Sequence, residues 1–462
     1  MRTRLVLLAP LLAGCPDRTI SGVPVEQGTV ETKDIPSVPR RDLDVLFVID
    51  SSGSMREEQE SLKANFPRFV SVLESIDGGL PNVHLGVITP DLGTQALDGS
   101  APAMPCSAPR LPPLPEQPPI AGGPLFLSDA DDGAGGRSRN YTGTLAERFS
   151  ELADVGDMGC GIEQHLESMK VALDNNPANA GFLREDALLA VVLIADEDDC
   201  SLAQKALFDG NTSDSTWGDR VNFRCTREGV ACDTPGTSLD QPGLREDCHP
   251  NYDSTMLTQT DRYATFLKGL KTDPRDVIVA GIVGDAGPFE IQAKTVGAQT
   301  YSVLKPSCTY NGASGAQFAY PAIRMLDFMS QFPGHATSTT ICDADLSDAL
   351  TQVAAQIVPE LGSPCFDSPL ADVDPFTAGP QYECTVTEYR RTGTADEELR
   401  VFPQCTSGRT PCWKVEEDAA QCFFTDTDPH LKLVLDLGGE AAQATTRLKV
   451  NCVTTTDSGE VM

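Results

Sequence analysis

Four nearly continuous apolar runs constrain the fold of this chain more than any other feature. They cover Leu43 to Ile49, Val83 to Thr89, Leu188 to Ala195 and Val277 to Val283. Such runs are typical of strands that are buried on both faces of a parallel sheet. Apolar residues at helical spacing follow them, near residues 62–73, 162–173, 263–270 and 346–357. This alternation predicts a doubly wound, mostly parallel α/β domain over residues 42–361, with any ligand at the carboxyl ends of the strands.

Two stretches interrupt the alternation and are predicted to be surface insertions. Residues 92–158 are rich in Pro, Gly and Asp, and residues 200–256 carry Cys200, Cys225, Cys232 and Cys248. Segments of this length are usually functional or disordered. Because these cysteines form no Cys-x-x-Cys pair, disulfides are favoured over a zinc site that would combine three of them with His249.

The pattern changes again after residue 362. Residues 363–462 contain short alternating segments separated by Gly, Pro and Asp, which predicts a small all-β module. Six of the 15 cysteines fall in this module: Cys365, Cys384, Cys405, Cys412, Cys422 and Cys452. Six is an even number, so the module can pair its own thiols, although the sequence leaves the connectivity open.

The N-terminus has the features of an export signal. Arg2 and Arg4 precede a short apolar run that is too short to span a bilayer. Residues 12–15 read Leu-Ala-Gly-Cys and resemble the lipobox of bacterial lipoproteins. The resemblance implies a signal peptide over residues 1–14, lipidation of Cys15 and export to the cell envelope, with the lipid as the membrane anchor. The alternative is an ordinary signal peptide with an incidental cysteine.

Two further features describe the exported chain. Residues 15–41 show neither helical nor strand period and are predicted to be a tether. The chain has 67 Asp and Glu against 35 Lys and Arg, a formal net charge of −32, and it contains no cluster of basic residues. Phosphate backbones need such a cluster, so nucleic acid is excluded as a partner.

A candidate metal site follows the first apolar run. Asp50, Ser52 and Ser54 alternate there, and Gly53 allows a tight turn between them. One carboxylate and two hydroxyls are hard oxygen donors, which suit Mg²⁺, Mn²⁺ or Ca²⁺ rather than zinc or copper. The alternative is that these residues only cap the next helix.

The segment 44–55, Asp-Val-Leu-Phe-Val-Ile-Asp-Ser-Ser-Gly-Ser-Met, resembles the first strand and the metal-ion-dependent adhesion site of von Willebrand factor type A domains. The resemblance covers residues 42–361. It implies that Asp196, which follows a later apolar run, is a further ligand, and that a carboxylate of a protein partner completes the coordination. The family also uses a Thr that the loop 157–161 lacks, so water, Asp157, Thr142 or Thr144 are the candidates to replace it.

Catalytic motifs are missing from the sequence. It has five histidines, no Gly-x-Ser-x-Gly elbow and no His-Glu-x-x-His helix, and His165, near Glu163, is expected at the surface. Together with the missing motifs, the two resemblances imply a non-enzymatic envelope lipoprotein that binds a carboxylate-bearing protein partner through Asp50, Ser52, Ser54 and Asp196. The cofactor is Mg²⁺ or Mn²⁺, with Ca²⁺ as the other candidate. The alternative is a structural envelope scaffold with a vestigial metal site.

Overall fold

A computed structural model describes residues 29–93, 125–159, 161–208, 217–219, 223–233, 238–374, 376–392, 395–405, 409–425, 427–443 and 445–455. The predicted signal peptide and Cys15 lie outside these residues. None of the helices in the described part of the chain is long and apolar enough to cross a membrane.

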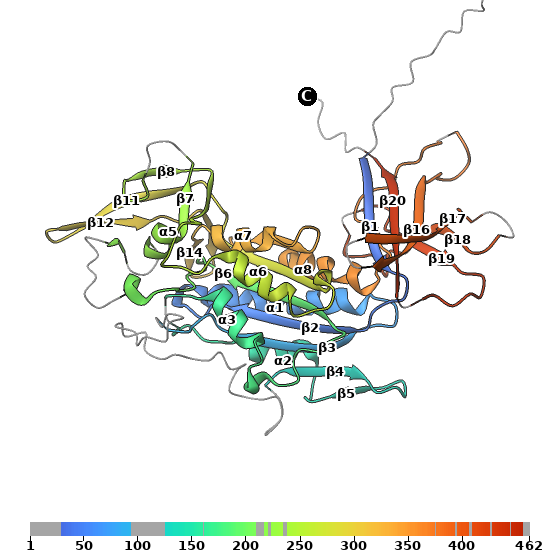
Figure 1. Cartoon of the computed structure of the whole chain (residues 1–462), viewed down its shortest axis with the longest axis horizontal. Helices are drawn as coiled ribbons and strands as arrows, with labels where there is room; N and C mark the ends of the chain where they lie inside the picture. The colour runs from blue at the N-terminus through green and yellow to red at the C-terminus, as the bar shows by residue number, and fades with distance from the viewer. Residues whose placement is uncertain are drawn as a thin grey trace, which may run out of the picture.

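A seven-stranded mixed sheet forms the centre of the larger part of the molecule (Figure 1). Its strands, in spatial order, are β15 (Ala336–Thr340), β10 (Val277–Val283), β6 (Leu188–Ala195), β2 (Asp42–Ile49), β3 (Asn82–Ile88), β4 (Leu127–Asp131) and β5 (Arg137–Arg139). The pairs from β15 to β3 are parallel, whereas β4 and β5 are antiparallel additions. The four apolar runs are thus confirmed as β2, β3, β6 and β10.

Helices cover both faces of this sheet. On one face the core includes residues of α1 (Arg56–Glu74), α2 (Leu145–Leu152) and α8 (Ser347–Leu361). On the other it includes residues of α3 (His165–Leu173), α6 (Thr260–Lys268) and α7 (Ile323–Ser330). Side chains of β2 alternate between the cores, with Phe47 in the first and Val48 in the second. Because both faces are buried, the strand has no polar side for water, which explains the continuous apolar runs.

The prediction that residues 92–158 form a surface insertion is wrong in part. Within it, β4 and β5 extend the central sheet and α2 packs against α1. These residues join the sheet because β4 and β5, which are close in the chain, pair with each other. Asp129 on β4 is buried and accepts from Arg137, Arg139 and Tyr141, so an acidic stretch becomes part of the sheet.

The second insertion and the segment after β10 form a group of small elements. They are α5 (Phe223–Gly229), β7 (Val230–Cys232), β8 (Gly243–Arg245), β9 (Cys248–Pro250), β11 (Phe289–Val296), β12 (Gln299–Leu304), β13 (Cys308–Gly312) and β14 (Gly315–Ala319). Disulfides join Cys200 to Cys225 and Cys232 to Cys248. The prediction of disulfides rather than zinc is confirmed. A further disulfide joins Cys308 to Cys342.

The C-terminal region is a small β module. Its four-stranded antiparallel sheet has the order β1 (Thr29–Pro36), β20 (Thr446–Thr454), β16 (Cys384–Thr392) and β17 (Ala395–Phe402), beside the pair β18 (Cys412–Glu417) and β19 (Leu431–Asp436). The six cysteines pair among themselves, as predicted: Cys365–Cys422, Cys384–Cys452 and Cys405–Cys412.

The prediction of a tether is wrong for residues 29–36. These residues form β1, which lies beside β20 at the far end of the chain (Figure 1). Ile35 is buried in the core of the β module. The sequence signal was weak because a single edge strand is stabilised by its partner rather than by its own pattern.

Ion pairs connect the β module to the larger part of the chain. Arg447 of β20 donates to Glu360 of α8 at 2.8 Å and to Asp34 of β1 at 2.7 Å. Arg391 of β16 donates to Asp273, which precedes β10, at 3.0 Å. Arg447 and Glu360 are both buried, so these contacts fix β1 and β20 against α8.

Candidate metal centre

The first part of the candidate centre is the loop between β2 and α1. Asp50 is completely buried at the end of β2, where its backbone N–H donates to Ile194 on the neighbouring strand at 3.0 Å. The backbone N–H of Ser52 donates to Asp50 Oδ1 at 2.6 Å. The hydroxyls of Ser52 and Ser54 lie 3.0 Å apart. The Asp50, Ser52 and Ser54 oxygens thus face a common space, as their alternation predicts.

Capping does not account for this loop. A single 3-10 turn, η1 (Gly53–Met55), leads into α1, and neither η1 nor α1 has a side-chain hydrogen bond at its N-cap. Within the described residues, Asp50 Oδ2 has no hydrogen-bond partner although it is buried. Buried carboxylate oxygens are normally paired, so this oxygen is available to a ligand.

The second part of the centre follows β6. Asp196 is 1% exposed, and neither of its carboxylate oxygens has a hydrogen-bond partner among the residues that the structure describes. Its carbonyl accepts the backbone N–H of Tyr320 at 2.7 Å, which fixes the backbone there. Ligand atoms of Asp50, Asp196 and Glu197 all lie within 4.8 Å of one another. The structure therefore brings together the predicted residues and adds Glu197.

The third part comes from the segment that leads into α3. Ligand atoms of Asp50, Glu163 and His165 also lie within 4.8 Å of one another. Glu163 is 3% exposed and His165 is completely buried. The expectation that His165 lies at the surface is wrong, because the first turn of α3 faces the carboxyl end of β2 rather than solvent. The sequence gives no signal for this position, because Glu163 and His165 are part of no recognised motif.

The three residues predicted as substitutes for the Thr face solvent or have other partners. Thr142 is exposed, and Thr144 caps α2 by accepting the Glu147 backbone N–H. Asp157 pairs with Arg56. Among the described residues of the 157–163 region, Glu163 has a carboxylate oxygen close to Asp50.

The electrostatics of the cluster follow from burial and from like charges. Burial, followed by the Asp50 charge, raises the pKa of Glu163 well above its usual value and that of Glu197 to about 8. Burial and the Glu197 charge also raise the pKa of Asp196 well above its usual value. Burial lowers the pKa of His165, so its imidazole is neutral at pH 7, the form that binds metals. Protons or cations must therefore compensate the carboxylates.

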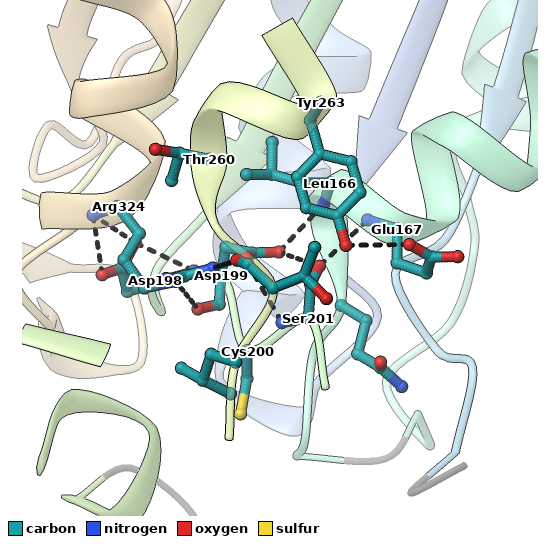
Figure 2. Close-up of polar contacts among 12 residues, drawn as sticks. Leu166, Glu167, Asp198, Asp199, Cys200, Ser201, Thr260, Tyr263 and Arg324 are labelled. Atoms are coloured by element: carbon teal, nitrogen blue, oxygen red, sulfur yellow. Dashed lines mark hydrogen bonds and ion pairs between the residues drawn. The ribbon is translucent and has the colours of Figure 1, made fainter. Parts of the chain in front are cut away.

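A network of polar contacts holds the loop after β6 in place (Figure 2). Asp199 accepts from the backbone N–H of Leu166 at 2.9 Å, from the Ser201 hydroxyl at 2.6 Å and from Arg324 at 3.0 Å. Asp198 accepts hydrogen bonds from the backbone N–H groups at the start of α7, including that of Arg324 at 2.9 Å. The loop that carries Asp196 and Glu197 is thus fixed to both α3 and α7, and Asp198 and Asp199 have structural roles.

Access to the cluster differs between its two sides. A cavity of about 20 Å³ lies against Glu163 and Glu197, and it has room for about one water molecule or ion. On the other side, Gly53 is exposed and Ser54 is half-buried. The backbone N–H of Gly159 donates to the carbonyl of Ser51 at 2.8 Å, and a Cβ at Gly159 would lie 2.3 Å from Ser51 Oγ. This contact places the segment 157–159 beside the loop between β2 and α1, with Met158 exposed to solvent.

Comparisons with known proteins identify no family. No protein-family model matches the sequence, and no curated protein matches it. Among solved structures, proximal thread matrix protein 1 from the mussel byssus aligns over 72% of this chain and 51% of that chain, with 12% identity and a TM-score of 0.31. The human COPII-coat protein Sec24c aligns over 92% and 46%, with 9% identity and a TM-score of 0.28. This chain spans about half the length of each, and at these scores neither likeness supports an argument.

Proposed function

We propose that this protein is a non-enzymatic lipoprotein of the bacterial envelope that binds a protein partner through a divalent cation. Residues 42–361 would form a von Willebrand factor type A-like domain. Asp50, Ser52, Ser54 and Asp196 would hold Mg²⁺ or Mn²⁺, and the ion would accept a carboxylate from the partner. Export would follow from the lipobox-like segment, with a lipid on Cys15 as the anchor.

One observation carries the metal assignment: Asp50 and Asp196 are buried, come from neighbouring parallel strands and present carboxylate oxygens without hydrogen-bond partners in the described part of the chain. An unpaired buried carboxylate costs several kcal/mol. A divalent cation removes this cost, and oxygen donors from carboxylates and hydroxyls are what Mg²⁺ and Mn²⁺ prefer.

The surface beside the loop favours a protein partner. The side chain of Met158 is 92% exposed next to the loop between β2 and α1, and Gly53 leaves that loop uncovered. An exposed methionine offers a flexible apolar contact to a partner. A partner that places a carboxylate at the ion would therefore cover Met158 as well.

Calorimetric titration of Mg²⁺ and Mn²⁺ tests the metal site. We expect saturable binding to the wild-type protein and none to Asp50→Ala. Asp154→Ala is the matched control, because this carboxylate is 65% exposed and pairs with Lys63 on the surface. The control should bind metal as the wild type does.

Partner binding is tested with the immobilised protein and an envelope extract. We expect Mn²⁺-dependent retention of a partner that EDTA releases, that Asp50→Ala loses and that Met158→Ser weakens without a change in the metal titration. Retention that ignores EDTA and Asp50→Ala would instead support the structural scaffold with a vestigial metal site. Absence of metal binding in the wild type would refute the proposed site altogether.

A further inference from the structure

The buried cluster contains two sets of ligand atoms that share Asp50. Asp50, Asp196 and Glu197 form one set, in which Asp50 and Asp196 belong to the site proposed above and Glu197 lies beside it. Asp50, Glu163 and His165 form the other, within the same limit of 4.8 Å. The second set includes an imidazole and comes from a different part of the chain, the start of α3.

His165 and Glu163 lack the hydrogen bonds that buried polar groups normally have. Neither ring nitrogen of His165 and neither carboxylate oxygen of Glu163 has a hydrogen-bond partner among the described residues. Both side chains are at least 98% buried. Their closest approach is 3.5 Å, between His165 Nε2 and Glu163 Oε2. A metal ion between them would satisfy both groups at once, whereas without an ion the ring nitrogens of His165 have no partner among the described residues.

Charge balance favours two ions over one. Asp50, Glu163, Asp196 and Glu197 contribute four carboxylates, and in the part of the chain that the structure describes no lysine or arginine forms an ion pair with any of them. One divalent cation would leave two buried negative charges when all four are ionised. Two divalent cations neutralise the cluster, and carboxylate-bridged pairs of ions about 3.5–4 Å apart are a known arrangement.

We propose that Asp50, Glu163 and His165 form a second metal position beside the first, with Asp50 shared by both ions. The imidazole beside two carboxylates suits a first-row transition ion better than Mg²⁺ or Ca²⁺, and Mn²⁺ is the member of that series used as the probe below. The inference rests on the proposed function, because it takes the first position as a cation site. It goes further in assigning ligands, stoichiometry and metal class.

Metal content and electron paramagnetic resonance test the second position. The purified full chain in detergent is loaded with Mn²⁺, desalted and measured. We expect two ions per chain and the signal of a spin-coupled pair. His165→Gln should keep one ion with the six-line signal of isolated Mn²⁺, and Asp50→Asn should keep none. His249→Gln, a histidine 41% exposed and remote in sequence from the cluster, should retain both.

Folding of each variant is checked by circular dichroism. Glu163→Gln replaces His165→Gln if the latter does not fold, and it should show the same loss of one ion. One ion in the wild type, or two ions that persist in the folded His165→Gln and Glu163→Gln variants, would overturn the second position while leaving the proposed function intact. No ion in the wild type would overturn both.

Discussion

Replacing Glu197 with Gln should stabilise the metal-free protein at pH 7 and destabilise the metal-bound protein. The substitution keeps the shape of the side chain and removes its charge. In the metal-free fold, burial and the Asp50 charge raise the pKa of Glu197 from 4.5 to about 8. The folded state therefore prefers the protonated acid, and Gln imitates that form.

The magnitude follows from linkage. A carboxyl whose pKa is raised on folding contributes most to stability below its unfolded pKa of 4.5, and this contribution is lost as pH rises toward 8. At pH 7 the loss spans about 2.5 pKa units, or about 3 kcal/mol at 1.36 kcal/mol per unit. Glu197 is half-buried, so we expect about 2 kcal/mol after discounting for solvent. Saturating Mn²⁺ at about 100 times its Kd stabilises the wild type by about 2.7 kcal/mol.

The assay is urea unfolding at pH 5 and pH 7, in EDTA and in saturating Mn²⁺. In EDTA at pH 7 we expect Glu197→Gln to be more stable than the wild type, and at pH 5 the difference should shrink. In Mn²⁺ the order should reverse, because the variant has lost a carboxylate charge beside the ion. Glu185→Gln, an exposed carboxyl, should follow the wild type throughout. A variant that is less stable in EDTA at pH 7, or a difference that is the same at both pH values, would refute the reasoning.

Three further predictions concern the framework around the cluster. Asp199→Ala leaves buried Arg324 without the carboxylate that lies 3.0 Å from it, so the free energy of unfolding should fall by about 3–5 kcal/mol. The Mn²⁺ affinity should fall as well, and an unchanged affinity in calorimetric titration would contradict a positioning role for Asp199. Phe47→Ala, in the core beside α1, should cost about 3–5 kcal/mol in urea unfolding without changing the metal stoichiometry of the folded protein. Arg447→Ala should lower stability by about 3 kcal/mol and increase proteolysis between α8 and the β module, whereas exposed Arg262→Ala should change neither.

The central strands could be predicted because each is buried on both faces. Leu188–Ala195 is completely buried, so its residues had to be apolar and their order alone revealed β6. The position of Asp50 and Asp196 followed from the same pattern, since parallel neighbours end at one edge of the sheet. By contrast, β4 and β5 contain several charged residues, and their place in the sheet depends on strand pairing that no local pattern encodes.

The sequence by itself determined the alternation of strands and helices, the cysteine-rich module and the carboxylate and hydroxyl groups that follow β2. These features depend on local periodicity and on residue chemistry. Only the tertiary structure decided that Glu163 and His165 face Asp50, and that Thr29–Pro36 pairs with Thr446–Thr454. Such contacts join segments far apart in the chain. Such a contact is stabilising only once the two segments are close together, so the local pattern of either segment alone does not predict it.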